Sequence, residues 1–156
     1  MEIGIYKTRL ECSQEAGKRA AQILKDAIAK KGKATFVAAT GASQFDFLQT
    51  LIADSEIDWS KTRMFHLDEY IDLPESHPAS FRKYLKERFL SKVKPGEVNL
   101  VNGEVDPAGE CKRLGELIAK EDVDVAFVGI GENGHLAFND PPADFDTEDA
   151  FIVVEL

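Results

Sequence analysis

Residues 129–140 carry the densest set of side chains that could do chemistry, and they read GIGENGHLAFND. Gly134 allows a tight backbone turn, after which His135 can project into a crevice. Asp140 follows closely enough to orient or protonate the imidazole, whereas Asn133 can orient it by a hydrogen bond but cannot ionise. A histidine beside a carboxylate suits proton transfer near neutral pH. A lone histidine is more often structural, so the residues alone leave both interpretations open.

The sequence predicts neither a bound cofactor nor a metal. The glycines of the same segment resemble a dinucleotide-binding fingerprint, but this segment comes late in the chain, and Pro141 and Pro142 prevent a long helix from following. We therefore do not expect NAD. Cys12 and Cys111 lack CxxC spacing and a nearby histidine, which predicts two reduced thiols and no zinc site.

A second candidate site is a turn of small residues that follows an apolar run and opens a helix. Its free backbone N–H groups, its hydroxyl groups and the positive helix end would suit a phosphate. The turn is not a Walker loop, because the Gly-Lys-Ser/Thr ending is missing. Ordinary turn chemistry would also explain these residue types. The residues of the turn are Thr40, Gly41, Ala42 and Ser43.

The third candidate is a pair of adjacent acids, Asp68 and Glu69, at the end of another apolar run. Neighbouring side chains of extended backbone point in different directions. One carboxylate can therefore face a crevice as a general base while the other makes structural contacts. Surface acids are common in a chain with 28 acidic residues, so a structural role for both stays open.

The elements that must position these residues alternate between strand and helix. Short apolar runs predict strands at 3–6, 34–39, 64–67, 98–101, 123–128 and 150–156. Apolar spacing predicts helices from a Ser13 cap to Gly32, over 45–52, over 80–90, and from Pro107 to 118. Such repeats predict one α/β domain over 1–156, a three-layer, mostly parallel, Rossmann-like sheet with helices on both faces. Ligands of these sheets bind beyond the carboxyl ends of the strands, where all the candidate residues lie.

Charge and hydropathy narrow the classes of partner. With 19 basic and 28 acidic residues among 156, the net charge is −9, which argues against nucleic acid and anionic membranes. No apolar run approaches the roughly 18 residues of a membrane span, and the first residues lack the pattern of a signal peptide. We expect a cytoplasmic protein whose partner is a small molecule.

Taken together, these segments resemble the glucosamine-6-phosphate deaminase (isomerase) family, within the larger group that includes 6-phosphogluconolactonases. The resemblance runs in order over essentially the whole chain. Its specific parts are FHLDEY at 65–70, HPASF at 77–81 and the segment from Gly129 to Pro141. Lactonases usually have arginine after the Asp-Glu pair, so Tyr70 favours the amino-sugar branch.

The resemblance implies conversion of an amino-sugar 6-phosphate to a ketose 6-phosphate and ammonia, without a cofactor. By motif, Asp68 matches the carboxylate that moves a proton between C2 and C1, and His135 matches the imidazole that assists ring opening. Asp140 and Asn133 occupy the places of acids around that imidazole, where many members have Glu and Asp. Residues that match the family's substrate contacts are Thr40, Gly41, Ala42, Ser43, Glu69 and Gly134.

Several alternatives remain at this stage. The substrate can be glucosamine or galactosamine 6-phosphate, the enzyme can be a phosphogluconolactonase, or the chain can bind sugar phosphates without turnover. Family members continue well beyond the length of this chain, so the resemblance implies a domain that is incomplete at its C-terminus. An unpaired sheet edge would promote association, so a homo-oligomer also stays open.

Overall fold

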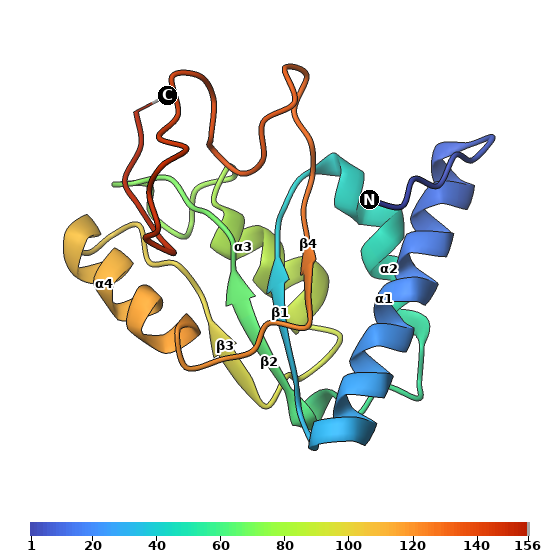
Figure 1. The fold of residues 1–156 in the computed structure, drawn as a ribbon. Helices are drawn as coiled ribbons and strands as arrows, with labels where there is room; N and C mark the ends of the chain where they lie inside the picture. The colour runs from blue at the N-terminus through green and yellow to red at the C-terminus, as the bar shows by residue number, and fades with distance from the viewer. Residues whose placement is uncertain (156) are drawn as a thin grey trace.

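A parallel sheet with the strand order β3-β2-β1-β4 forms the centre of the molecule (Figure 1). The computed structural model describes residues 1–155. The strands are β1 (Ala34–Ala38), β2 (Thr62–His66), β3 (Glu97–Asn99) and β4 (Val125–Phe127). The α-helices are α1 (Arg9–Lys31), α2 (Phe45–Ala53), α3 (Phe81–Leu85) and α4 (Pro107–Ile118). Two short 3₁₀ helices, η1 (Ala42–Gln44) and η2 (Trp59–Lys61), and a π-helical continuation of α3, η3 (Lys86–Leu90), complete the regular structure of the described residues. The predicted α/β fold is confirmed.

Helices cover both faces of the sheet, which makes three layers (Figure 1). Side chains alternate across β1, so Phe36 packs with the core formed by α1, α2 and α3, whereas Val37 packs on the other face with Leu114 of α4. Every residue of β1 is buried, because a central parallel strand has neighbours on both faces. The sheet therefore fixes the positions at which the loops after β1 and β2 begin.

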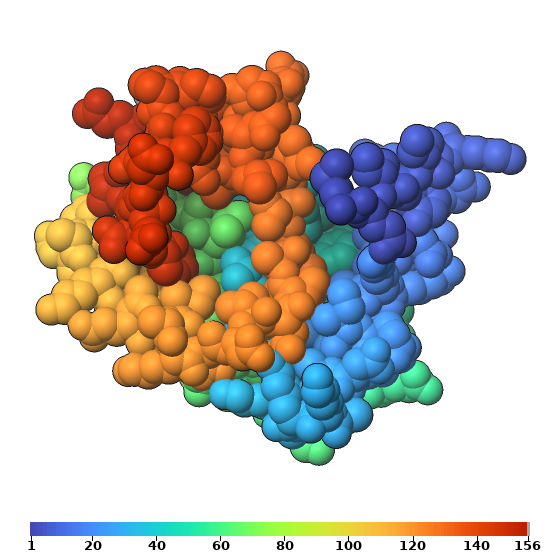
Figure 2. Space-filling view, viewed as in Figure 1, coloured from blue at the N-terminus to red at the C-terminus, as the bar shows by residue number. Residues whose placement is uncertain are grey.

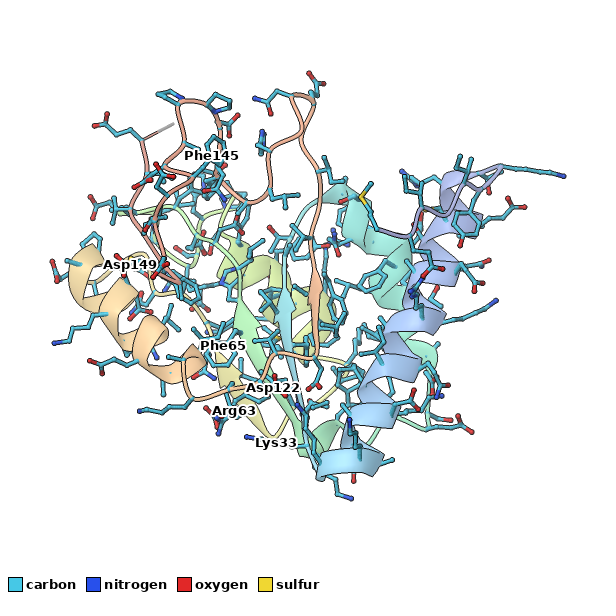
Figure 3. All side chains as sticks on the ribbon, in the orientation of Figure 1. Lys33, Arg63, Phe65, Asp122, Phe145 and Asp149 are labelled. Carbon is cyan, nitrogen blue, oxygen red and sulfur yellow. The ribbon has the colours of Figure 1, made fainter. Side chains whose placement is uncertain are left out.

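Ion pairs gather at the end of the sheet where the strands begin. Glu121, whose side chain is 4% exposed, pairs with Lys33 at 2.8 Å and with Arg63. Lys31 pairs with Asp124 at 2.8 Å. Figure 3 shows Lys33, Arg63 and Asp122 at this end, far from Phe145 at the opposite end. The charged residues here join the strand starts to the loop before β4.

Helix α1 begins earlier than the sequence predicts. The hydroxyl of Thr8 accepts a hydrogen bond from the N–H of Glu11 at 3.1 Å, so Thr8 is the N-cap. The expected cap, Ser13, lies within the helix and is buried. Both residues can cap a helix, and the extra turn forms because Ser13 belongs to the packed face. The predicted end at Gly32 is confirmed, with a φ of 79°.

The terminal apolar runs do not form the expected strands. Residues 3–6 have no regular structure, and Ile5 is 92% exposed. In the described part of 150–156, no strand is present either, although Phe151 packs against the α4 core. A strand needs a neighbour for its backbone N–H and C=O groups, and neither segment lies beside one. The N-terminal tail runs along the start of α1, where Glu2 pairs with Arg19 at 2.7 Å, at the edge of the molecule (Figure 2).

No helix within residues 1–155 is both long enough and apolar enough to span a bilayer.

Candidate active site

The loops after β1, β2 and β4 meet at the carboxyl ends of these strands and line a cleft of about 230 Å³. Thr40 and Gly41 come from the first loop, Asp68 from the second, and Gly129 and His135 from the third. These residues lie far apart in sequence, and the parallel sheet brings them to one edge. No group of three potential metal ligands is found among residues 1–155.

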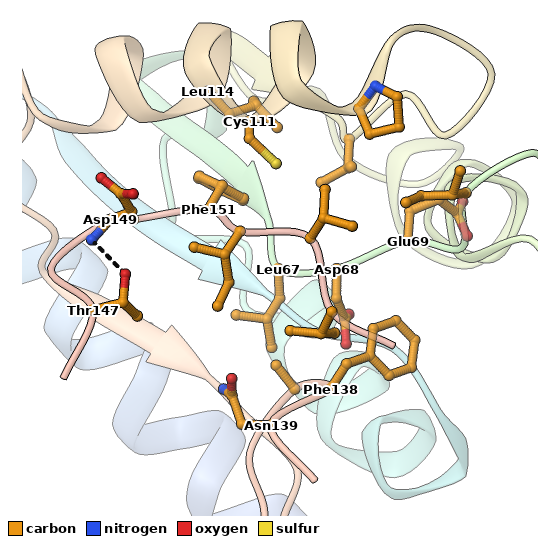
Figure 4. A pocket seen from close by; sticks show the side chains of 18 of the residues that line it. Leu67, Asp68, Glu69, Cys111, Leu114, Phe138, Asn139, Thr147, Asp149 and Phe151 are labelled. Carbon is orange, nitrogen blue, oxygen red and sulfur yellow. Dashed lines mark hydrogen bonds between the residues drawn. The ribbon is translucent and has the colours of Figure 1, made fainter. Parts of the chain in front are cut away.

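The adjacent acids of the second loop face different surroundings. The carboxylate of Asp68 faces the cleft, and Figure 4 shows it pointing toward the ring of Phe138. Burial, followed by the nearby charge of Glu69, raises the pKa of Asp68 to about 6. A carboxyl group with this pKa can both accept and return a proton near neutral pH.

The carboxylate of Glu69 is instead directed into the protein and has 0% side-chain exposure. It accepts hydrogen bonds from the N–H groups of Phe81 (3.1 Å) and Arg82 (2.8 Å) and from the hydroxyl of Ser80 (3.0 Å). It also accepts the N–H of Tyr70 at 3.0 Å. These bonds join the Asp68 loop to the start of α3. The Glu69 carboxylate is thus engaged with the loop and with α3, whereas the sequence predicts a substrate contact for this residue, which also lines the larger cavity beside the cleft.

An aromatic cluster of Tyr70, Phe81 and Phe138 stands beside Asp68. Phe81 and Phe138 are stacked with centroids 5.9 Å apart, and Tyr70 lies 5.1 Å from Phe81 and 5.0 Å from Phe138. Phe81 and Phe138 also line the cleft. Apolar rings around a carboxylate keep water from it, which accounts for the dominant effect of burial on the pKa of Asp68.

The imidazole of His135 is held by its own loop. Its Nδ1 lies 2.5 Å from Oδ1 of Asn133 and 3.0 Å from Oδ1 of Asp140. The Asn133 amide also donates to Asp140 at 3.2 Å. Gly134, at φ 88°, makes the turn that the sequence predicts, and the N–H of Gly131 donates to the carbonyl of His135 at 2.9 Å. With Nδ1 engaged, Nε2 is left for a ligand in the cleft.

The turn after β1 forms one wall of the cleft. Gly41 has a φ of 111°, which only glycine adopts readily, and its carbonyl accepts the N–H of Gln44 at 3.1 Å. Thr40 and Gly41 line the cleft, whereas Ala42 and Ser43 are exposed beside it. The structure thus brings the first half of the expected phosphate turn directly to Asp68 and His135.

A larger cavity of about 790 Å³ adjoins the cleft and shares Asp68 and His135 with it (Figure 4). Its other walls are α4 and the segment 144–154, and they include Leu114, Cys111 and Phe151. Figure 2 shows the surface hollowed between α4 and this segment. Burial raises the pKa of the Cys111 thiol, which therefore stays protonated at neutral pH.

Sequence reasoning missed the contributions of α3 to the site. Phe81 stood out only as the last residue of the HPASF motif, and Tyr84 only as a position within the helix expected over 80–90. In the structure Phe81 lines the cleft, and the hydroxyl of Tyr84 donates to the carbonyl of Gly41 at 3.1 Å. Phe81 and Tyr84 are three residues apart, which places both rings on the same side of a helix, and this spacing could have indicated that they pack against one loop.

Comparisons with known proteins identify the family of this chain. The family model of glucosamine-6-phosphate isomerases/6-phosphogluconolactonase matches residues 7–155. The chain belongs to this family. A glucosamine-6-phosphate deaminase of Latilactobacillus sakei is 36% identical over 134 residues, which cover 85% of this chain and 56% of that protein. One of Streptococcus pneumoniae serotype 4 is 34% identical over 141 residues, covering 90% and 60%.

Solved structures of similar proteins share the fold of this chain. A monomeric glucosamine-6-phosphate deaminase matches with a TM-score of 0.83 and 28% identity, over 94% of this chain and 62% of that one. A 6-phosphogluconolactonase of Shewanella baltica, at 22% identity and a TM-score of 0.74 over 87% and 59%, shares the fold. The chain spans about 56–60% of the length of the two curated deaminases from Latilactobacillus sakei and Streptococcus pneumoniae.

Proposed function

We propose that the chain acts on an amino-sugar phosphate, converting glucosamine 6-phosphate to fructose 6-phosphate and ammonia. The observation that carries this proposal is the cleft in which a turn suited to phosphate, a partly buried carboxyl group with a raised pKa and a held imidazole meet. The deaminases at 34–36% identity support the amino-sugar substrate. We further propose that residues 1–156 form one sugar-phosphate domain, acting in the cytoplasm in amino-sugar catabolism.

The proposed reaction divides between two groups of residues. His135, oriented by Asn133 and Asp140, transfers a proton at the ring oxygen and opens the sugar. Asp68 then takes the proton from C2 and returns it to C1, while the amine gives up a proton and the carbonyl oxygen at C1 gains one, so that C1 becomes a CH₂OH group and C2 an imine. Water adds to the imine, and ammonia leaves as the ketose forms. Positioned proton transfer of this kind is worth on the order of 10² to 10⁴ in rate.

The remaining residues bind and position the substrate. Thr40 and Gly41 offer backbone at the phosphate, with Ala42 and Ser43 beside them at the positive end of the first turn. Gly134 sets the direction of the histidine. In place of the substrate contact first expected of Glu69, we assign that carboxylate to holding the Asp68 loop.

The test is proton NMR of the purified chain with glucosamine 6-phosphate in D₂O, following deuteration at C2 and formation of fructose 6-phosphate. The matched variant is Asp68→Asn, which keeps the shape of the side chain but removes the base. We expect exchange and product in the unchanged chain, and binding without exchange in the variant. Exchange that persists in Asp68→Asn would contradict the assigned base.

A second candidate is sugar-phosphate binding without turnover, which requires only the turn after β1 and the cleft that it lines. The same experiment separates the two. Stabilisation of the fold by glucosamine 6-phosphate, without deuteration or product, would establish binding alone.

A further inference from the structure

The ring of Tyr84, on α3, touches the turn after β1 at both of its ends. Its hydroxyl donates to the carbonyl oxygen of Gly41 at 3.1 Å. Its ring is stacked on Phe45, the first residue of α2, with centroids 5.7 Å apart and an interplanar angle of 16°. One side chain therefore holds both the start and the end of the turn that faces the cleft.

Arg88 adds a third layer to this stack. It lies one helical turn after Tyr84, and its guanidinium carbon is 4.3 Å from the centroid of Phe45 and 5.4 Å from that of Tyr84. A guanidinium over aromatic rings is attracted by their negative faces. Among residues 1–155 no carboxylate forms an ion pair with Arg88, so the two aromatic rings are what its guanidinium group packs against there.

The hydroxyl of Tyr84 is suited to remain a donor. Burial raises the pKa of Tyr84 to about 12, although the charge of Arg88 acts in the opposite direction. The hydroxyl therefore keeps its proton throughout the neutral range. The carbonyl of Gly41 also accepts the N–H of Gln44, so it receives two hydrogen bonds that fix the plane of the peptide bond leading to Ala42.

This peptide plane matters because its N–H belongs to the turn proposed to bind phosphate. Gly41 has a φ of 111°, and glycine has more backbone freedom than any other residue type. If the turn were loose, it would lose this conformational entropy when an anion binds, which would weaken the affinity. A turn already held in place avoids this cost and binds an anion more tightly. Proton transfer takes place at Asp68, so its rate should not depend on how firmly the turn is held.

We propose that Tyr84 is a positioning residue for phosphate recognition, which holds the turn from Gly41 to Phe45 through its hydroxyl and its ring, with Arg88 bracing the stack. This inference rests on the proposed function, since it assigns the turn to the phosphate of the substrate. It adds a specificity element on α3 that does not itself line the cleft.

The test uses Tyr84→Phe, which keeps the stacked ring and removes only the hydroxyl. The matched control is Tyr6→Phe, in the exposed N-terminal tail. Inorganic phosphate is titrated into the unchanged chain and both variants, and the amide signals of residues 41–43 are followed by NMR. In separate samples free of inorganic phosphate, C2 exchange of glucosamine 6-phosphate in D₂O gives kcat and KM.

We expect Tyr84→Phe to weaken the affinity for phosphate about two- to tenfold, the usual effect of one neutral hydrogen bond. KM should rise by a similar factor while kcat stays unchanged, and Tyr6→Phe should match the unchanged chain. Arg88→Gln should also weaken phosphate binding. A merely structural role would lower thermal stability without this separation of KM from kcat.

Two results would overturn the inference. The first is an unchanged phosphate affinity in Tyr84→Phe, or a loss of kcat at constant KM. The second is the absence of phosphate-induced shifts at residues 41–43 in the unchanged chain. In the second case the C2 exchange still decides the proposed function by itself, so the two failures can be told apart.

Discussion

Replacement of Glu69 by Gln tests whether the Asp68 loop is held by a buried carboxylate. The Glu69 side chain has 0% exposure and accepts three backbone N–H groups and one hydroxyl at 2.8–3.1 Å. It also lies 3.5 Å from Nε of Arg82, whose side chain is 6% exposed. In Glu69→Gln, an amide NH₂ group replaces one of the two acceptor oxygens. This NH₂ group would face N–H or O–H donors that the carboxylate now satisfies, so those donors would lose their acceptor. The buried guanidinium also loses a neutralising charge.

The expected loss of stability is large for a single isosteric change. Removing one partner of a buried, hydrogen-bonded charge pair costs about 3–5 kcal/mol. In a domain of this size each kcal/mol lowers Tm by about 2–4 °C, so Tm should fall by roughly 6–20 °C. The matched control is Glu104→Gln, which removes the partner of Arg82 that is 44% exposed and 2.8 Å from its Nη2. Exposed pairs contribute about 0–1 kcal/mol.

Urea denaturation at several pH values measures both variants. Burial raises the pKa of Glu69, but hydrogen bonds from the N–H groups of Arg82, Phe81 and Tyr70 and from Ser80 outweigh it and leave the pKa lowered. A carboxyl group with a lowered pKa stabilises the fold fully above its unfolded pKa of about 4.3. This contribution is lost as the pH falls through the folded pKa. The difference between Glu69→Gln and the unchanged chain should therefore be largest near pH 7 and shrink in acid.

A loss below about 1 kcal/mol at pH 7, or equal losses in Glu69→Gln and Glu104→Gln, would refute this reasoning. Either result would mean that the hydrogen bonds to Glu69 do not hold the loop.

Other predictions concern the histidine, a close contact and the core. His135→Gln should slow reaction of the cyclic sugar more than that of an open-chain analogue, and equal slowing in kinetic assays would remove ring opening from its role. A Cβ on Gly103 would lie 2.0 Å from the carbonyl oxygen of Tyr70, so Gly103→Ala should cost about 1–3 kcal/mol in urea denaturation. Leu24→Ala, at a side chain with 0% exposure, should cost about 2–5 kcal/mol. Leu10→Ala, at 51% exposure, should stay within about 0.5 kcal/mol, and similar losses for both would contradict the described core.

The local parts of the fold could be predicted from the sequence. A continuous apolar run predicts β1 as a strand buried on both faces, and Gly32 ends α1 as expected. Residues after the apolar runs were expected at one edge of a parallel sheet, and Thr40, Gly41, Asp68 and His135 lie together there. These features depend on periodicity, on glycine's freedom at positive φ and on the geometry of parallel strands, all of which act over short stretches of chain.

Tertiary contacts decided the features that the sequence left open or predicted wrongly. Ser13 could have capped α1, but packing buried it and Thr8 took the cap. Residues 3–6 have the composition of a strand, yet no neighbouring strand is present to accept their backbone hydrogen bonds.

The surroundings of the candidate site were also beyond the sequence. Asp68 and Glu69 are equivalent as residue types, and only the folded structure leaves one facing the cleft and seals the other against the N–H groups of α3. The hydroxyl of Tyr84 meets Gly41 across 43 residues of chain. Sequence patterns report which face of an element is apolar, whereas the partner of a polar group depends on which distant segment packs against it.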